Sequence, residues 1–139
     1  MNVKMTGKEL QESLAYFTGT EQYHRYGFFG RNVVLTDGVK HLAEKGECYW
    51  LLDVIVSYIP QLKKIMESDS RLAMSFWKLK KNETGKGYTV FCVADSGEEP
   101  VIKQEFSGGV IGPLSEIEEM DLWVNYDGET WVIYLPSEH

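Results

Sequence analysis

Residues 17–27, FTGTEQYHRYG, form the densest group of chemically active side chains in the sequence. Glu21 and His24 are three residues apart, and Asp37 and His41, in the segment DGVKH, are four apart. Either spacing could place two side chains on one face of a helix, as oxygen and nitrogen ligands for a metal ion. Glu-x-x-His is common by chance, and nothing in the sequence brings the two segments together. We therefore predict no metal and no other cofactor, and keep His24 and His41 only as candidate ligands.

The same residues permit acid–base chemistry. His24 could be oriented by Asp37 or Asp53, because catalytic sites use a carboxylate to orient an imidazole. Glu21, His24, Asp37 and Asp53 are therefore the candidate catalytic residues of a small metal-dependent or acid–base hydrolase. The sequence contains no phosphate-binding loop and no GxGxxG, GxSxG or HExxH motif. Catalysis is therefore an alternative interpretation, and whether the protein is an enzyme stays open.

A structural role explains these side chains equally well, and we favour it. Thr18 and Glu21 repeat the Thr-x-x-Glu pattern of a capping box and predict the start of a helix. Asp53 would pair with Arg25 or His24 and fix the opening loop to a helix. The structural polar cluster predicted in this way comprises Thr18, Thr20, Glu21, His24, Arg25, Asp53 and Ser57.

Helices are expected in the first half of the chain. Thr6 and Glu9 form a capping box that predicts a helix over residues 7–17. A loop that can include a short helix follows, and then a strand at residues 33–35. Thr36 or Asp37 can begin the next helix, which Gly46 would end.

Residues 49–59 are almost entirely apolar and predict a central buried helix, which Pro60 kinks or restarts. Trp50, Asp53 and Ser57 share one face of that helix by their spacing. Either this face points away from the core, or Asp53 is buried and paired, because an unpaired buried carboxylate is costly.

From residue 71 the pattern changes to strands. Alternating segments separated by turn residues predict strands within 71–81, 86–95, 100–106, 121–126 and 130–135, with one helical turn at 115–119. Asp-Gly in the segment YDGE favours a two-residue turn that pairs Tyr126 with Glu129. This register places Trp123 opposite Val132 and Asp121 opposite Tyr134.

Both faces of this last hairpin are apolar. One face must cover the helices, and the other lies under another layer or is exposed for a partner. The residues of the second face, which we predict to bind a partner, are Trp123, Val132 and Tyr134.

These elements predict an α+β fold, with three to four N-terminal helices on one face of a mostly antiparallel sheet of about five strands. A length of 139 residues with 43% hydrophobic residues is typical of one domain. We expect a single domain over residues 1–139, mainly helical over 1–69 and mainly strands over 70–139.

The charge is uneven along the chain. The net charge of −7 argues against direct nucleic-acid binding, which depends on neutralising phosphates. Residues 95–139 hold eleven acidic residues against one base, Lys103. They could form an acidic edge that binds a basic partner or inhibits a nucleic-acid-handling complex, or they could pack beside the lysines of FWKLKK.

The sequence also indicates a compartment. It has no secretory signal and no apolar run of about 18 residues, the length needed to span a membrane. We therefore expect a soluble, cytoplasmic protein with no membrane contact. Cys48 and Cys92 lie in apolar segments without CxxC spacing, which predicts two buried free thiols.

Three segments, FTGTEQYHRY, LTDGVKHLAEKGECYWLLDVIVSY and YLPSEH, resemble a small bacterial domain family of unknown function. The family is often seen in cyanobacteria and on mobile or accessory DNA, and the resemblance implies no activity. It covers most of the chain, although SGGVIGPLSEIEEMD departs from the family pattern. The positions that match the family's recurring residues are Thr18, Thr20, Glu21, His24, Asp37, Trp50, Asp53 and Ser57.

We therefore predict a small soluble binding module. It would contact a protein partner, or a second copy of itself, through the sheet face or the acidic edge. The hydrolase and the acidic inhibitor are the two alternatives.

Overall fold

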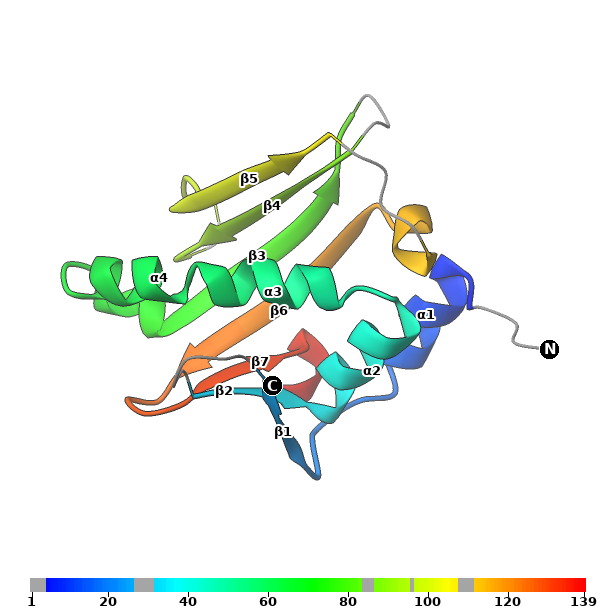
Figure 1. Cartoon of the computed structure of the whole chain (residues 1–139), viewed down its shortest axis with the longest axis horizontal. Coiled ribbons are helices and arrows are strands. Elements are labelled where there is room, and N and C mark those ends of the chain that lie inside the picture. The colour runs from blue at the N-terminus through cyan, green and yellow to red at the C-terminus, as the bar shows by residue number, and fades with distance from the viewer. Residues whose placement is uncertain (1–4, 27–31, 84–86, 96, 108–111) are drawn as a thin grey trace.

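The computed structural model describes residues 5–26, 32–83, 87–95, 97–107 and 112–139. Within these ranges four α-helices and seven strands form an α+β fold (Figure 1). The predicted class is therefore confirmed, whereas the predicted number of strands is wrong. The turn expected near residues 84–86 and part of the opening loop, residues 27–31, lie outside the described residues.

All seven strands belong to one mixed sheet with the order β1-β2-β7-β6-β3-β4-β5. The pair β2 and β7 is parallel, and the other neighbouring pairs are antiparallel. The strands are β1 (Tyr23–Tyr26), β2 (Val33–Thr36), β3 (Met74–Lys81), β4 (Tyr88–Val93), β5 (Ile102–Phe106), β6 (Glu119–Tyr126) and β7 (Trp131–Tyr134).

The sheet is larger than predicted because β1 and β2 join it from the half of the chain expected to be mainly helical. The segment YHRY of β1 is short and polar, so it lacks the apolar alternation that identifies a strand in a sequence. Its neighbour β2 was predicted almost to the residue, because the run VVL is apolar, and Val33 and Leu35 of this run are buried. No helix begins at Thr18, and the helix start predicted there is wrong.

The helices begin where their capping residues predict. In α1 (Gly7–Leu14), the Glu9 amide donates to Thr6 Oγ1 at 3.1 Å and the Thr6 amide donates to Glu9 Oε1 at 3.2 Å. The capping box is confirmed, although α1 ends before the predicted residue 17. In α2 (Asp37–Lys45), Thr36 accepts from the amide of Val39.

The central apolar segment forms two successive helices, α3 (Tyr49–Ser57) and α4 (Ile59–Met66). Pro60 lies in the first turn of α4, so the predicted restart is confirmed. Asp53 and Ser57 are exposed, while the opposite side of α3 is buried. The face shared by Asp53 and Ser57 therefore points away from the core.

The helices cover one face of the sheet, as expected (Figure 1). Sheet residues on that face are buried and meet the apolar sides of the helices in one core. Within the described ranges no α-helix lies on the opposite face, and most of its apolar side chains remain partly exposed (Figure 1). The largest sheet residues on the covered face are Trp77, Leu79, Tyr88, Leu122 and Trp131.

The register of the last hairpin differs from the prediction by two residues. Trp123 lies opposite Tyr134 and Tyr126 opposite Trp131, so a four-residue loop, 127–130, replaces the predicted two-residue turn. The Asp127 carboxylate accepts from the amides of residues 129 and 130 at 2.8 and 2.7 Å and so stabilises the longer loop. A shift of two residues keeps every side chain on its predicted face.

Three further predictions can be compared with the described residues. The helical turn expected at residues 115–119 is a 3₁₀ helix over Pro113–Glu116. Cys48 and Cys92 are buried free thiols, as predicted, and burial raises the pKa of each to about 12. Among the described residues, no helix is long and apolar enough to cross a membrane.

Candidate functional site

The polar residues near the start of the chain form a small cluster where β1 meets α2. His24 Nε2 donates to Asp37 Oδ1 at 2.8 Å, and the Glu21 amide donates to Asp37 Oδ2 at 2.9 Å. The Asp37 amide in turn donates to Thr20 Oγ1 at 2.8 Å. The pKa of Asp37 is lowered, first by the hydrogen bond from His24 and then by the Glu21 amide. This cluster fixes the segment before β1 to the first turn of α2.

Asp53 belongs to a different group of residues. Its carboxylate accepts from the hydroxyl of Tyr26, whose ring stacks on Tyr49 with the centroids 6.0 Å apart. Burial, and secondarily the bond to Asp53, raise the pKa of Tyr26. The predicted pairing of Asp53 with His24 or Arg25 is therefore wrong, because the partner of Asp53 is the tyrosine two residues after His24.

The rest of the predicted polar cluster is dispersed. The Ser57 hydroxyl donates to the carbonyl of Val54 within its own helix, at 2.6 Å. Thr18 and Arg25 are exposed. Only the Thr20, Glu21 and His24 part of the cluster gathers, and it does so around Asp37 rather than around Asp53.

The two candidate metal ligands have separate partners. His41 contacts Ser13 Oγ through Nε2 at 3.0 Å and packs against the ring of Phe17, and burial lowers its pKa. His24 bonds to Asp37. Within the described parts of the chain, no group of three or more His, Cys, Asp or Glu side chains could hold a metal ion.

The helix-free face of the sheet is the second chemically distinctive region. Ring contacts follow one another across neighbouring strands. Phe76 of β3 meets Trp123 of β6 edge to face at 5.3 Å between centroids, and Trp123 meets Tyr134 of β7 at 6.0 Å. We call Phe76, Trp123 and Tyr134 the aromatic row. His139 packs on Trp123 at 5.2 Å between ring centroids and on Tyr134, the β7 end of the row, at 5.9 Å.

A band of paired charges runs beside the aromatic row on the same face. Lys78 lies 3.4 Å from a carboxylate oxygen of Glu119 and 3.7 Å from one of Asp121. Lys80 lies 3.8 Å from Glu119. The acidic strand β6 therefore packs beside the lysines of FWKLKK, which was one of the two expectations. It does not form an unbroken acidic edge here.

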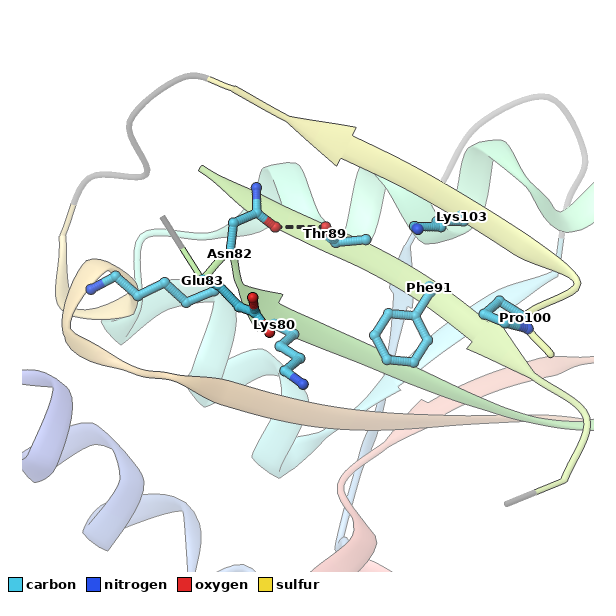
Figure 2. A pocket seen from close by; sticks show the side chains of 8 residues that line it. Lys80, Asn82, Glu83, Thr89, Phe91, Pro100 and Lys103 are labelled. Atoms are coloured by element: carbon cyan, nitrogen blue, oxygen red, sulfur yellow. Dashed lines mark hydrogen bonds between the residues drawn. The ribbon is translucent and has the colours of Figure 1, made fainter. Parts of the chain in front are cut away.

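Two pockets flank Phe91 of β4 on this face. The first, of about 350 Å³, is the lysine pocket, whose walls include Lys80, Lys81, Lys103 and Glu83. Figure 2 shows Phe91 and Thr89 on β4 between the strands that carry Lys80 and Lys103, with the helices behind the sheet.

The second, of about 510 Å³, is the acidic pocket. Its apolar wall includes Phe76, Phe91, Val93 and Trp123, and its charged wall is formed by Lys78, Asp95, Glu98 and Asp121.

A third pocket, of about 530 Å³, lies at the other end of the aromatic row and is lined by Val132, Tyr134 and Glu138 among others. Glu138 lies in a short 3₁₀ helix, Pro136–Glu138, and anchors the YLPSEH segment to the start of α2. Its carboxylate accepts from Thr36 Oγ1 at 2.6 Å and from the Gly38 amide at 3.1 Å. A Cβ on Gly38 would lie 2.6 Å from Leu135 Cδ1 and 2.7 Å from Glu138 Oε1, so these two side chains would have to shift to accommodate it.

A model for a family of unknown function, DUF6876, matches residues 8–139 of the chain. The chain belongs to this family. No curated protein and no solved structure matches it. The expected resemblance to a family of unknown function is thus confirmed, whereas the bacterial and mobile-DNA setting, the cytoplasmic location and the single domain stay predictions.

The DUF6876 match spans both regions described above. Trp50 packs edge-on against Phe106 of β5 with ring centroids 5.7 Å apart. Phe76 and Phe91, which extend the face of Trp123, were not predicted from the sequence. In the segments SFWKLKK and TVFCV, alternate side chains point to opposite faces of the strand, so the sequence shows which residues share a face. Only the strand order shows that β3 lies between β4 and β6.

Proposed function

We propose that this DUF6876 protein is a binding module that contacts a protein partner through the helix-free face of its sheet. The observation that carries the proposal is the aromatic row, which lies on the face that the helices leave uncovered. When one face of a sheet contacts only water, the side chains on that face are usually polar. Here, Phe76 and Trp123 remain partly exposed on that face.

The chemistry of the face fits protein contact. Aromatic side chains supply much of the binding energy in protein interfaces, and a polar rim around them is typical. The aromatic row has such a rim in Lys78, Lys80, Glu119 and Asp121. Trp123 and Val132, two of the residues predicted to bind, remain central to this proposal, together with Phe76 and Phe91. The third, Tyr134, is only 8% exposed and packs against the ring of Trp123.

The hydrolase alternative has less support. Of its four residues, only His24 and Asp37 have side chains in contact, and Asp53 bonds to Tyr26 instead. The three pockets described above are not lined by His24 or Asp37. The hydrogen bond between His24 and Asp37 instead fits a structural role, in which it holds β1 to the start of α2.

The acidic-inhibitor alternative also has less support. An inhibitor that imitates nucleic acid needs a continuous row of carboxylates. Lysines of β3 lie among the carboxylates of β6 and pair with Glu119 and Asp121. The acidic half of the sequence is thus locally neutralised on this face.

Site-specific photo-crosslinking in cells would test the proposal. A benzophenone-bearing phenylalanine at position 91 keeps an aromatic ring on the helix-free face and should form covalent adducts with whatever protein lies there. The matched control places the same residue at Tyr16, which is 86% exposed and follows α1. Adducts at position 91 that are absent at position 16, and weaker after Trp123→Ala, are expected. No adducts at position 91, or equal adducts at both positions, would contradict the proposal.

A further inference from the structure

The acidic pocket of the helix-free face combines aromatic rings with carboxylates. Phe76 of β3 lies opposite both Trp123 of β6 and Val93 of β4, and the planes of the Phe76 and Trp123 rings are nearly perpendicular, at 88°. Phe91 belongs to the same lining. The volume of about 510 Å³ lies within the range of ligand-binding pockets. The pocket can therefore hold one side chain of another protein beside three aromatic rings of this face.

Asp121 is the carboxylate of the pocket that shares a strand with Trp123. It lies two residues before Trp123 on the same face of β6, about 7 Å along the strand. Its Oδ1 is 3.7 Å from the ammonium of Lys78, beyond hydrogen-bond distance, whereas Lys78 donates to Glu119 at 3.4 Å. Among the described residues no group donates a hydrogen bond to the Asp121 carboxylate, and its side chain is 49% exposed. The carboxylate is thus open to a donor from another molecule.

The surroundings of the pocket are negative even when its ion pairs are counted. The described charged residues that line the pocket, or belong to the same networks of ion pairs, are five carboxylates and three bases. They are Asp69, Asp95, Glu98, Glu119 and Asp121, with Arg71, Lys78 and Lys80. Arg71 already holds Glu98, so Glu98 is not needed for binding. The remaining net charge of −2 favours a cation as the occupant.

We propose that the protein partner inserts an arginine side chain into the acidic pocket, where its guanidinium lies against Trp123 and donates to the carboxylate of Asp121. This inference rests on the proposed function and names the chemistry of the partner. A guanidinium is flat, stacks on aromatic rings and can donate to both oxygens of a carboxylate, which a lysine ammonium does less well. The net charge of −7 on the chain also favours encounter with a basic surface.

Titration of the full, isotope-labelled chain with N-acetyl-arginine amide tests the inference by nuclear magnetic resonance. The indole signal of Trp123 reports on the pocket, and that of Trp131, which is 3% exposed on the covered face, is the internal control. The Trp123 signal should shift and saturate with a Kd in the millimolar range, as expected for a ligand of this size, while the Trp131 signal stays in place. No saturable shift of Trp123 up to about 50 mM overturns the inference.

Two further probes separate charge from shape. N-acetyl-citrulline amide has nearly the shape of the arginine probe but no charge, so it should give no saturable shift. N-acetyl-lysine amide carries its charge on an ammonium and should bind more weakly than the arginine probe. Equal binding of the citrulline probe would refute recognition of a cation. Equal binding of the lysine probe would refute the choice of arginine.

A substitution locates the cation at Asp121. Asp121→Asn keeps the size of the side chain and removes its charge, and it should weaken binding of the arginine probe about fivefold, as loss of an exposed ion pair does. The matched control is Glu105→Gln, which removes one charge at a 70% exposed side chain of β5 outside the lining of this pocket. This control should bind like the wild type. Unchanged affinity in Asp121→Asn, or an equal loss in Glu105→Gln, overturns the inference.

Crosslinking from position 91 connects the pocket to the protein partner. Asp121→Asn should lower the yield of adducts at position 91, and Glu105→Gln should not. Failure of this inference is distinguishable from failure of the proposed function. Adducts with the same yield in the wild type and in Asp121→Asn refute only the arginine, whereas the absence of adducts at position 91 refutes both.

Discussion

The two faces of β3 differ more than any other neighbouring parts of the molecule. Trp77 is 2% exposed in the core, where its Nε1 donates to Ser75 Oγ at 3.1 Å. Phe76, the next residue, points to the other side, where it is partly exposed and packs against Trp123. Both faces carry aromatic residues, so composition alone does not separate them. Only the covered face has helices to complete its core, and this difference makes the other face available for binding.

The largest expected effect comes from substituting these two neighbours. Trp77→Ala should lower the free energy of unfolding by about 3–5 kcal/mol, because it removes a large buried ring and leaves a cavity. Phe76→Ala should lower it by about 1–2 kcal/mol, because less of its area is removed from water. Urea denaturation followed by circular dichroism measures both values. Equal losses at the two positions would mean that the helix-free face is also part of a core.

The next effect concerns the anchor at the end of the helix-free face. Gly38→Ala should destabilise the protein by about 1–3 kcal/mol, because the new Cβ overlaps Leu135 and Glu138. Helix propensity alone predicts a gain of up to about 1 kcal/mol from the same change. The change in melting temperature on thermal unfolding shows whether Gly38→Ala destabilises or stabilises the protein. Gly19→Ala, where nothing lies within 4 Å of the added atom, is the control and should have little effect.

A smaller, pH-dependent effect is expected at the polar cluster of β1 and α2. The pKa of Asp37 is lower in the folded protein than its ordinary value of about 3.9. Asp37 therefore stabilises the fold fully above that value, and this contribution is lost as the pH falls through the lowered folded pKa. Asp37→Asn should be less stable than the wild type at neutral pH.

The difference between Asp37→Asn and the wild type should shrink on acidification. Urea midpoints measured from pH 7 to pH 2 show whether it does. The lowered pKa values of Asp69 and Asp127 leave part of the acid sensitivity in the variant. A difference that is independent of pH would refute the contribution of the Asp37 carboxylate.

The smallest effect on stability is expected from the charge band of the helix-free face. Lys80→Ala should change the free energy of unfolding by less than about 0.5 kcal/mol, because exposed ion pairs contribute little. The same substitution should lower the yield of crosslinked adducts at position 91, because Lys80 belongs to the charged rim beside the aromatic row. Urea denaturation measures the effect on stability, and the yield of adducts at position 91 measures the effect on binding. A large loss of stability would show that the band supports the fold rather than an interface.

The sequence predicted the helices better than the sheet. Capping patterns are local, so Thr6 with Glu9, Thr36 and Pro60 marked helix starts that the structure confirms. Strand β1 was missed because its four residues have no apolar alternation, and it is a strand only because it pairs with β2. The hairpin register was missed because the Asp127 carboxylate bonds to two amides of the loop, a choice that the Asp-Gly pair does not reveal.

The candidate sites show the same division. The contact between His24 and Asp37 was one of the two pairings expected for His24, because a carboxylate can orient an imidazole. The partner of Asp53 was missed because Tyr26 lies on an unpredicted strand. The faces of Trp123, Val132 and Tyr134 were predicted correctly, since alternation survives a register shift of two.

The sequence by itself determined the class of fold, the helix starts, the buried thiols and the division of each strand into two faces. These properties depend on interactions within a few residues and on side-chain periodicity. The tertiary structure alone decided the strand order, the joining of β2 to β7, and the placing of Phe76, Trp123 and Tyr134 in one row across three strands. Those contacts join residues far apart in the chain, where no local pattern records which strands become neighbours.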